Sequence, residues 1–305
     1  MLIGIVGPGA MGCLLAARFA AVDIDVLLID YKPERAAEIG ARGVTVVEQD
    51  GTETVVSVRA TADPSVVSEA DGLIFTVKAY STPDVARSLS GFARGDAWAL
   101  TLQNGMGNAE ALEEALGVGR VLAGTTSEGA TLLGAGRVKH GGRGETFIGE
   151  YSGGNGARAA AVVSAFESAG FKAALTDDPR GLLWKKLVVS VGINPATALL
   201  RIRNGELAER EDARELYLSA VAEAAAVARA AGAEIGDVEA VALVEAVARG
   251  TAGNVSSMHQ DIAAGRRTEI DFICGYVARE GERLGVPTHA NEKLLELIHN
   301  AECEN

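Results

Sequence analysis

The order of apolar and polar positions divides this 305-residue chain into a half with strands and helices and a half with helices alone. In the first half, apolar runs of strand length alternate with segments whose apolar residues recur every three or four positions. The predicted strands cover residues 2–6, 26–29, 72–77, 97–102, 121–125, a segment around 138 and 146–148, and the predicted helices cover 10–21, 33–42 and 82–89. Residues 44–47 and 54–58 alternate about an Asp-Gly turn and predict a β-hairpin. This order predicts a doubly wound α/β domain with some antiparallel extension.

From about Pro179 onward the pattern changes to helices, with no strand-like run. The predicted helices cover residues 182–200, 214–231, 238–249, 271–284 and 291–299. Pro195 should kink or interrupt the first of them, because proline lacks the N–H that a helix interior uses. We therefore expect an α/β domain over residues 1–178 and an all-α domain over 179–305. Ligands of such folds bind beyond the carboxyl ends of the parallel strands, so we expect the active site in the crevice between the two domains.

A glycine-rich turn between the first strand and the first helix predicts a dinucleotide site. The turn consists of Gly7, Pro8, Gly9, Ala10, Met11 and Gly12. In such a turn the first glycine allows a sharp bend, the second lets backbone N–H groups approach a pyrophosphate, and the third lets the helix pack closely on the sheet. The flanking strands and helix indicate a Rossmann-type nucleotide-binding domain; the alternative is a turn that serves packing only.

The second strand ends at Asp30, near the spacing at which a carboxylate binds the adenosine ribose hydroxyls. A carboxylate there repels a 2′-phosphate and so favours NADH over NADPH. Two cations, Lys32 and Arg35, follow closely and could turn toward a phosphate instead. The alternative role of Asp30 is to cap the helix that starts near Pro33.

The net charge of −13 argues against nucleic acid or an anionic membrane surface as a partner, because both need clustered lysine and arginine. A hydrophobic fraction of 48% is ordinary for a globular protein with two domains. Three widely separated cysteines without motif spacing suggest reduced thiols and a cytoplasmic protein. The first apolar stretch lacks a basic n-region, and no apolar run reaches the length of a membrane span. Neither a signal peptide nor a transmembrane helix is therefore predicted.

Two polar residues follow apolar strands directly, at the edge of the sheet where ligands bind. Lys78 is suited to contact cofactor or substrate. Asn104 could hold the nicotinamide ribose or a substrate oxygen, or it could simply shape an Asn-Gly turn. A second set, Lys186, Ser190 and Asn194, recurs every four residues and so lines one face of an otherwise apolar helix. Polar groups on such a face need partners or a wet cleft, which indicates a site.

A third polar stretch surrounds a predicted helix start. Asn254 and Ser257 suit capping, but a helix N-terminus with a nearby hydroxyl also binds a carboxylate. Glu269 precedes an apolar run, where it could cap the following helix or pair with a lysine of the cleft. His259 has no evident orienting partner and is left without a role. The sequence contains no zinc-type spacing, carboxylate pair or nucleophile elbow, so no metal is expected.

Several motifs, in order along nearly the whole chain, resemble those of the ketopantoate reductase (2-dehydropantoate 2-reductase) family. They are the glycine turn at 7–12 and residues 77–79, 103–107, 183–187, 193–198, 204–207, 256–258, 260–261 and 268–271. The resemblance implies NAD(P)H-dependent reduction of a small 2-oxoacid, ketopantoate, to pantoate in pantothenate biosynthesis.

The resemblance also implies roles for the site residues. Lys186 would be the general acid that protonates the ketone oxygen, and Glu269 would position that lysine, the substrate hydroxyl and the cofactor. Lys78 and Asn104 would sit between cofactor and substrate. The substrate would be held by Ser190, Asn194, Asn204, Asn254 and Ser257.

Two departures from the family pattern keep alternatives open. The family often has asparagine where Ser190 stands, which leaves open a related reductase of another branched 2-oxoacid. It commonly has arginine near the end of the second strand to hold the 2′-phosphate of NADPH, whereas this chain has Asp30. From other classes, a dinucleotide-binding redox sensor needs no proton donor, so Lys186 and Glu269 argue against it, and a structural domain would bind no dinucleotide. The alanine-rich C-terminal helices could form a homodimer interface or ordinary core.

Overall fold

The computed structural model describes residues 1–153 and 156–304. Within them the chain forms two compact units. The first contains Met1–Gln103 and Asn108–Pro179, and the second contains Arg180–Asn305 together with the short segment Asn104–Gly107. The first unit combines strands and helices and the second is helical, so the predicted fold class is confirmed.

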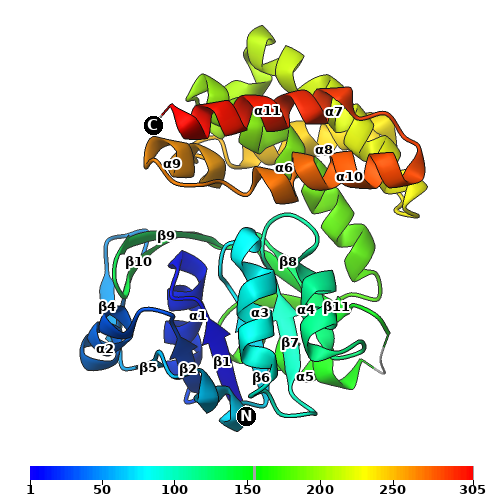
Figure 1. The fold of residues 1–305 in the computed structure, drawn as a ribbon. Coiled ribbons are helices and arrows are strands. Elements are labelled where there is room, and N and C mark those ends of the chain that lie inside the picture. Colours follow the sequence, from blue (N-terminus) through cyan, green and yellow to red (C-terminus); the bar gives the residue numbers. More distant parts are fainter. Residues whose placement is uncertain (154–155, 305) are drawn as a thin grey trace. The chain divides into compact units, whose positions relative to one another are not determined.

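An eight-stranded sheet forms the centre of the first unit (Figure 1). Its order is β12-β11-β8-β7-β6-β1-β2-β5. The strands from β8 to β5 are parallel, whereas β11 runs antiparallel to β8. Their bounds are β1 Leu2–Val6, β2 Asp25–Ile29, β5 Arg59–Thr61, β6 Gly72–Phe75, β7 Trp98–Thr101, β8 Val121–Thr126, β11 Glu145–Glu150 and β12 Lys172–Leu175. The strand order reverses between β2 and β6 on either side of β1, which creates the switch point where α/β sheets bind ligands.

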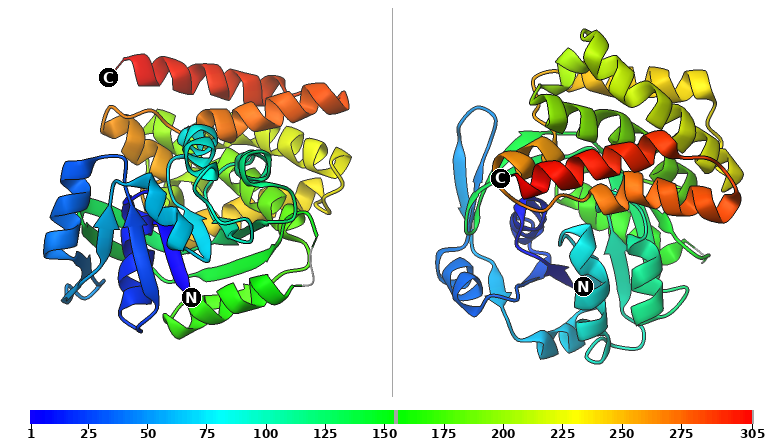
Figure 2. Two further views of the ribbon diagram at one scale, coloured as in Figure 1. Left: turned by 60° about the horizontal axis from the view of Figure 1, so that its bottom comes forward. Right: turned by 45° about the horizontal axis from the view of Figure 1, so that its top comes forward.

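A smaller sheet, in the order β4-β3-β10-β9, packs against α1 (Ala10–Ala20), which also packs on β1 and β2 of the central sheet. The bounds of its strands are β3 Val44–Val47, β4 Glu53–Val56, β9 Gly129–Gly134 and β10 Arg137–Gly142. The antiparallel pairing of β3 and β4 confirms the predicted hairpin. Figure 2 shows this hairpin and α2 (Pro33–Arg42), both in blue, at one end of the unit. The other helices described here are α3 Thr82–Ser90, α4 Asn108–Leu116 and α5 Ala157–Ser168.

The second unit is built from helices whose buried faces are rich in alanine and valine. The bounds are α6 Pro179–Leu200, α7 Glu211–Ala230, α8 Asp237–Gly250, α9 Ser257–Ala263, α10 Cys274–Leu284 and α11 His289–Cys303, with short 3-10 turns η3 Asn204–Ala208 and η4 Ile270–Phe272. Figure 2 shows α10 and α11 side by side, in orange and red, in agreement with their extensive contacts.

Two sequence predictions for this unit need correction. The helix α6 continues through Pro195, so of the predicted kink or interruption the interruption is wrong: Ile193 and Ala196 beside the proline are buried, and this packing outweighs the lost hydrogen bond. The helix predicted over 271–284 begins only at Cys274, because residues 270–272 form the separate turn η4. Ile273, with φ −108° and ψ −94°, breaks the helical path between them.

Candidate active site

The glycine turn places the N-terminus of α1 beside the carboxyl end of β1. Gly7 has a φ of +104° and donates its N–H to the carbonyl oxygen of Ile29 at 2.9 Å. A Cβ at Gly12 would lie 2.0 Å from the carbonyl oxygen of Gly7, so a larger residue cannot fit without moving the backbone. Gly7 and Gly12 are therefore required by the fold itself.

Gly9 has no such structural requirement. Its φ of −75° suits any residue, and an added Cβ would be 3.8 Å from the nearest protein atom. Gly9 is the N-cap of α1, no side chain caps the helix there, and the first turn has no acidic residue. The first N–H groups of α1 therefore form a cradle that a pyrophosphate fits and that a Cβ at Gly9 would partly fill.

Asp30 follows β2 directly, is buried and is bound twice by one guanidinium. Arg35 donates through Nε to Oδ2 at 2.5 Å and through Nη2 to Oδ1 at 2.6 Å. This hydrogen bonding raises the pKa of Arg35 above its usual value. Oδ1 also accepts the N–H of Lys32, which is itself the N-cap of α2, so the capping role predicted for Asp30 is wrong.

Lys78 lies just beyond β6 and is half-buried. The backbone beside it is fixed by Gln103, which follows β7. The amide Nε2 of Gln103 donates to the carbonyl oxygen of Val77 at 2.6 Å and to the hydroxyl of Thr82 at 2.8 Å. Gln103 thus links the two strand ends that carry Lys78 and Asn104, a role that no local sequence pattern indicates.

Asn104 opens the short segment that belongs to the second unit, where this segment packs on Phe272. Met106 donates its N–H to the carbonyl oxygen of Phe272 at 2.9 Å, and a Cβ at Gly105 would lie 2.5 Å from that oxygen. The N–H of Phe272 in turn donates to the carbonyl oxygen of Glu269 at 2.9 Å. The Asn-Gly pair does form a turn, with a φ of +78° at the glycine, and this turn packs on the segment that begins at Glu269.

Lys186 lies on α6, on the face that it shares with the buried Ser190 and the half-buried Asn194. Although part of its side chain is exposed, burial lowers the pKa of the Lys186 ammonium to about 8, and the carboxylate of Glu269 opposes that shift. Glu269 is 8% exposed and stands at the start of η4 without capping it through its side chain. Of the two roles predicted for Glu269, capping of the following helix is wrong. The other role, pairing with a lysine, agrees with the effect of the Glu269 charge on the pKa of Lys186. A lysine with this pKa is suited to proton transfer.

Two aromatic rings pack in the same unit. The rings of Trp184 on α6 and Tyr276 on α10 lie 5.7 Å apart at 61°. A Cβ at Gly107 would lie 3.7 Å from the Tyr276 ring, so the 104–107 segment lies beside α10 at this ring. No local sequence pattern indicates this pair of rings, because Trp184 and Tyr276 lie far apart in the chain.

Asn204 meets Asn254 through the backbone: the N–H of Asn204 donates to the carbonyl oxygen of Asn254 at 3.0 Å. The side chain of Asn204 is 7% exposed and donates through Nδ2 to the hydroxyl of Thr251 at 2.9 Å. Its Oδ1 atom is buried and has no hydrogen-bond partner in the described part of the chain. A buried amide oxygen of this kind usually accepts a hydrogen bond, from a water molecule or a ligand hydroxyl.

The helix α9 is capped by Ser256, and the capping role predicted for Asn254 and Ser257 is wrong. The Ser256 hydroxyl accepts the N–H of His259 at 3.2 Å and the hydroxyl hydrogen of Thr197 at 2.8 Å. Asn254 and Ser257 are both exposed. The doubled serine explains the error, because the cap falls one residue before the one predicted.

Among residues 1–153 and 156–304, no group of three or more His, Cys, Asp or Glu side chains is arranged to hold a metal ion. Over the same ranges, none of the helices combines the length and the apolar character needed to cross a membrane.

Comparison with known proteins gives one family for both parts of the chain. The family described as "Ketopantoate reductase PanE/ApbA" matches residues 3–153, and its C-terminal counterpart matches residues 178–302. The chain is 38% identical to a 2-dehydropantoate 2-reductase of Halobacterium salinarum over 302 residues, which covers 99% of both chains. It is 35% identical to one of Archaeoglobus fulgidus over 303 residues, which covers 98% of this chain and 97% of the relative.

Solved structures give the same result. A PanE/ApbA family ketopantoate reductase from Ralstonia eutropha matches with a TM-score of 0.89 and 33% identity, covering 100% of this chain and 99% of the other. A D-mandelate dehydrogenase, solved with NADH and anilino(oxo)acetate, matches with a TM-score of 0.93 and 28% identity over the same shares of the chains.

Proposed function

The chain belongs to the ketopantoate reductase family of 2-dehydropantoate 2-reductase-like oxidoreductases, and on this premise we propose that it reduces 2-dehydropantoate (ketopantoate) to pantoate with NAD(P)H. The observation that carries the proposal is the environment of Lys186. Burial lowers the pKa of its ammonium to about 8, and the carboxylate of Glu269 acts against that shift. A protein that only binds a dinucleotide has no use for such a proton donor.

We assign the dinucleotide to residues 1–178 and the proton donor and most substrate contacts to residues 179–305. The six residues of the glycine turn would hold the pyrophosphate through the N–H groups at the start of α1. The open space around Gly9 supports this assignment, because the fold alone would accept a larger residue there.

When bound, the reduced nicotinamide supplies the hydride that converts the ketone carbon to an alcohol carbon. Negative charge then develops on the ketone oxygen, and the Lys186 ammonium donates a proton to that oxygen. Glu269 raises the pKa of Lys186 against the effect of burial and so keeps the amine charged before the reaction. After the transfer, the neutral amine takes up a proton from solvent.

The substrate contacts follow from the polar groups of the helical unit. The buried Oδ1 of Asn204 would accept a substrate hydroxyl. Hydroxyl and amide donors for the substrate carboxylate and its remaining oxygens would come from Ser190, Asn194, Asn254 and Ser257. Both cofactor and substrate would be contacted by Lys78, Asn104 and Glu269.

For the cofactor we propose a preference for NADH, with Asp30 as its determinant. A carboxylate at this position binds ribose hydroxyls and repels a 2′-phosphate. The nearest guanidinium, that of Arg35, is bound to Asp30 through two hydrogen bonds and is therefore not available to a phosphate.

A second candidate is the reduction of another 2-oxoacid. It is favoured by the serine at position 190 and by the likeness to a D-mandelate dehydrogenase. The proposal is tested by initial rates with NADH and with NADPH on ketopantoate and on 2-oxo-2-phenylacetate, the oxoacid that corresponds to mandelate. Faster turnover of 2-oxo-2-phenylacetate favours the second candidate. If the chain binds the cofactor but none of the 2-oxoacids leads to its oxidation, the result supports a redox sensor.

A further inference from the structure

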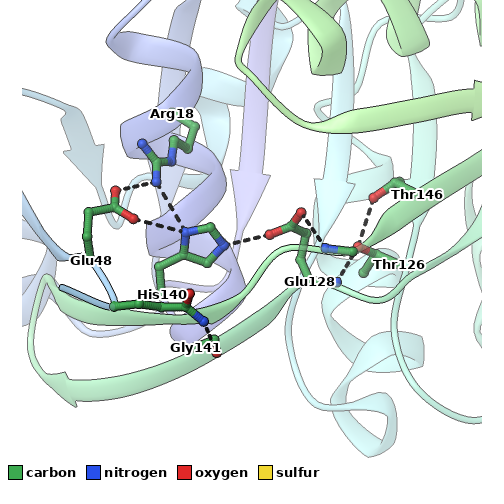
Figure 3. Close-up of polar contacts among 9 residues, drawn as sticks. Arg18, Glu48, Thr126, Glu128, His140, Gly141 and Thr146 are labelled. Carbon is green, nitrogen blue, oxygen red and sulfur yellow. Dashed lines mark hydrogen bonds and ion pairs between the residues drawn. The ribbon is translucent and has the colours of Figure 1, made fainter. Parts of the chain in front are cut away.

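A buried histidine in the first unit lies between two carboxylates (Figure 3). His140 on β10 is 3% exposed. Its Nε2 lies 2.7 Å from Oε2 of Glu128, and its Nδ1 lies 3.2 Å from Oε2 of Glu48. Arg18, in the last turn of α1, pairs with Glu48 and lies 3.2 Å from the same Nδ1. We call these four residues the His140 cluster.

The position of His140 does not call for a polar residue. Two residues earlier on the same face of β10, Val138 is fully buried in the apolar core, together with Val46 of the neighbouring strand. Apolar residues at 140 and at its buried partner Glu128 would continue that core, and replacing a whole buried polar cluster in this way is often neutral or stabilising. A polar cluster at such a position is therefore more readily explained by function than by stability.

What the His140 cluster fixes is the backbone that follows β8. The other oxygen of Glu128, Oε1, accepts the N–H of Gly144 at 3.1 Å. Ser127 donates its N–H to the carbonyl oxygen of Glu145 at 2.9 Å, and a Cβ at Gly144 would lie 2.4 Å from Ser127. Glu128 is thus the link through which His140 holds residues 126–128.

The hydroxyl of Thr126 holds the same segment from the other side. It lies 2.8 Å from the hydroxyl of Thr146 on β11 and accepts the N–H of Glu128 at 3.2 Å (Figure 3). Residues 126–128 are therefore restrained by both side-chain and backbone bonds.

These residues lie at the ligand-binding edge of the central sheet. The strands β8, β7, β6 and β1 pair in parallel, so the carboxyl end of β8 is on the same edge as the glycine turn and Lys78. Asp30, the residue proposed to bind the adenosine ribose, follows β2 on that edge. A dinucleotide that crosses the edge with its pyrophosphate at the glycine turn must direct its nicotinamide half toward β6, β7 and β8.

We propose that His140 is a positioning residue for the cofactor: through Glu128 it holds residues 126–128 in the shape that receives the nicotinamide half of the dinucleotide. This inference rests on the proposed function, because it requires that the chain bind NADH or NADPH.

The test is to measure the affinity of the full chain for NADH and for ADP-ribose by calorimetry. ADP-ribose lacks the nicotinamide, so it reports the rest of the site. In Glu128→Gln one of the two carboxylate oxygens becomes an NH2 donor, so either His140 or the N–H of Gly144 loses its acceptor. We expect the Kd of NADH to rise about tenfold or more, in keeping with the loss of a hydrogen bond to a charged group, while the Kd of ADP-ribose stays within about twofold.

His140→Ala should have the same selective effect, and His140→Gln, which keeps an N–H donor, should restore much of the NADH affinity. The matched control is Glu53→Gln, which breaks an exposed pair with Arg137 on the same small sheet and should change neither affinity. If the wild type prefers NADPH, the ligands become NADPH and 2′-phospho-ADP-ribose.

Equal weakening of both ligands in Glu128→Gln and His140→Ala would overturn the inference, because the cluster would then only support the fold. Unchanged NADH affinity in a folded Glu128→Gln protein would overturn it as well. If the wild type bound no dinucleotide at all, the proposed function itself would fail, an outcome distinct from the other two.

Discussion

At the scale of single residues, the proposed chemistry depends on one ammonium group. Lys186→Ala removes the proposed proton donor, and general acid catalysis of this kind is worth about 10²–10⁴-fold. We expect kcat for ketopantoate reduction to fall by that order, while NADH still binds. The neighbouring Lys185 is the matched control, because its side chain is 39% exposed and pairs only weakly with Glu239 at 3.4 Å. Lys185→Ala should reduce the substrate at nearly the wild-type rate, and comparable losses in both variants would contradict the assignment.

The same lysine predicts a pH dependence. The proposed reduction needs the protonated amine, and burial lowers the pKa of Lys186 to about 8. We therefore expect kcat/KM to be level below that pH and to decrease above it, since kcat/KM reports the free enzyme. Glu269 raises the pKa of Lys186, so Glu269→Gln should move the decrease to lower pH. A decrease that stays at the same pH in Glu269→Gln would show that the two groups are not coupled.

Asp30 and Arg35 together predict the cofactor preference. Asp30→Asn removes a charge that repels a 2′-phosphate and releases the guanidinium of Arg35. We expect the ratio of kcat/KM for NADPH to that for NADH to rise about tenfold or more, the value of one charge-assisted contact. Adding Arg35→Gln should cancel most of this gain. The idea fails if Asp30→Asn leaves the ratio unchanged.

These residues also show what a sequence can and cannot predict about a site. The face shared by Lys186, Ser190 and Asn194 follows from helical spacing alone. The pairing of Asp30 with Arg35 and the action of Glu269 on Lys186 depend on side-chain directions and on contacts between distant segments. The sequence leaves the pairing of Glu269 with a lysine as one of two alternatives and does not indicate the pairing of Asp30 with Arg35.

At the scale of elements, the start of α1 gives a separate test of the dinucleotide site. Gly9→Ala adds a Cβ that no protein atom approaches closer than 3.8 Å. Folding should therefore be unaffected, whereas the added Cβ should hinder the pyrophosphate and weaken NADH about tenfold or more. Gly12→Ala is the contrasting variant, because its Cβ would lie 2.0 Å from the carbonyl oxygen of Gly7. It should lose about 1–3 kcal/mol of stability from overpacking. Normal NADH affinity in Gly9→Ala would argue that the turn serves packing only.

The elements absent from the sequence prediction include α4 and β5, and three others share a weak pattern. The helix α5 is rich in alanine and has little contrast between its faces. The strands β9 and β12 are mostly exposed, and their glycine and alanine residues hide the alternation of apolar and polar side chains that usually marks a strand. Strongly apolar strands such as β1, β6 and β7 are predicted correctly, because burial on both faces leaves a continuous apolar run.

At the scale of the whole molecule, the order of elements along the chain follows from the sequence, but their neighbours in space do not. The sheet order places β1 between β2 and β6, and the smaller sheet joins β3 to β10 in parallel across a long stretch of chain. The segment Asn104–Gly107 groups with the helical unit although it lies within the sequence of the first. Such pairings are set by long-range packing, which no local periodicity encodes.

Ligand-linked stability separates the three classes of function that the sequence leaves open. A ligand that binds only the folded chain at 100 times its Kd adds about 2.7 kcal/mol of stability, so NADH should raise the Tm by a measurable amount. A domain whose glycine turn only packs would show no such rise with NADH or NADPH. A redox sensor would show the rise and leave NADH unoxidised when ketopantoate is added, whereas a reductase would oxidise it. Lys186→Ala sharpens the comparison: it should keep the rise in Tm while losing the oxidation, because we assign the proton transfer to Lys186 and the dinucleotide to the glycine turn. Loss of both in a folded Lys186→Ala protein would mean that binding and proton transfer depend on the same residue, contrary to the division of roles proposed for the two units.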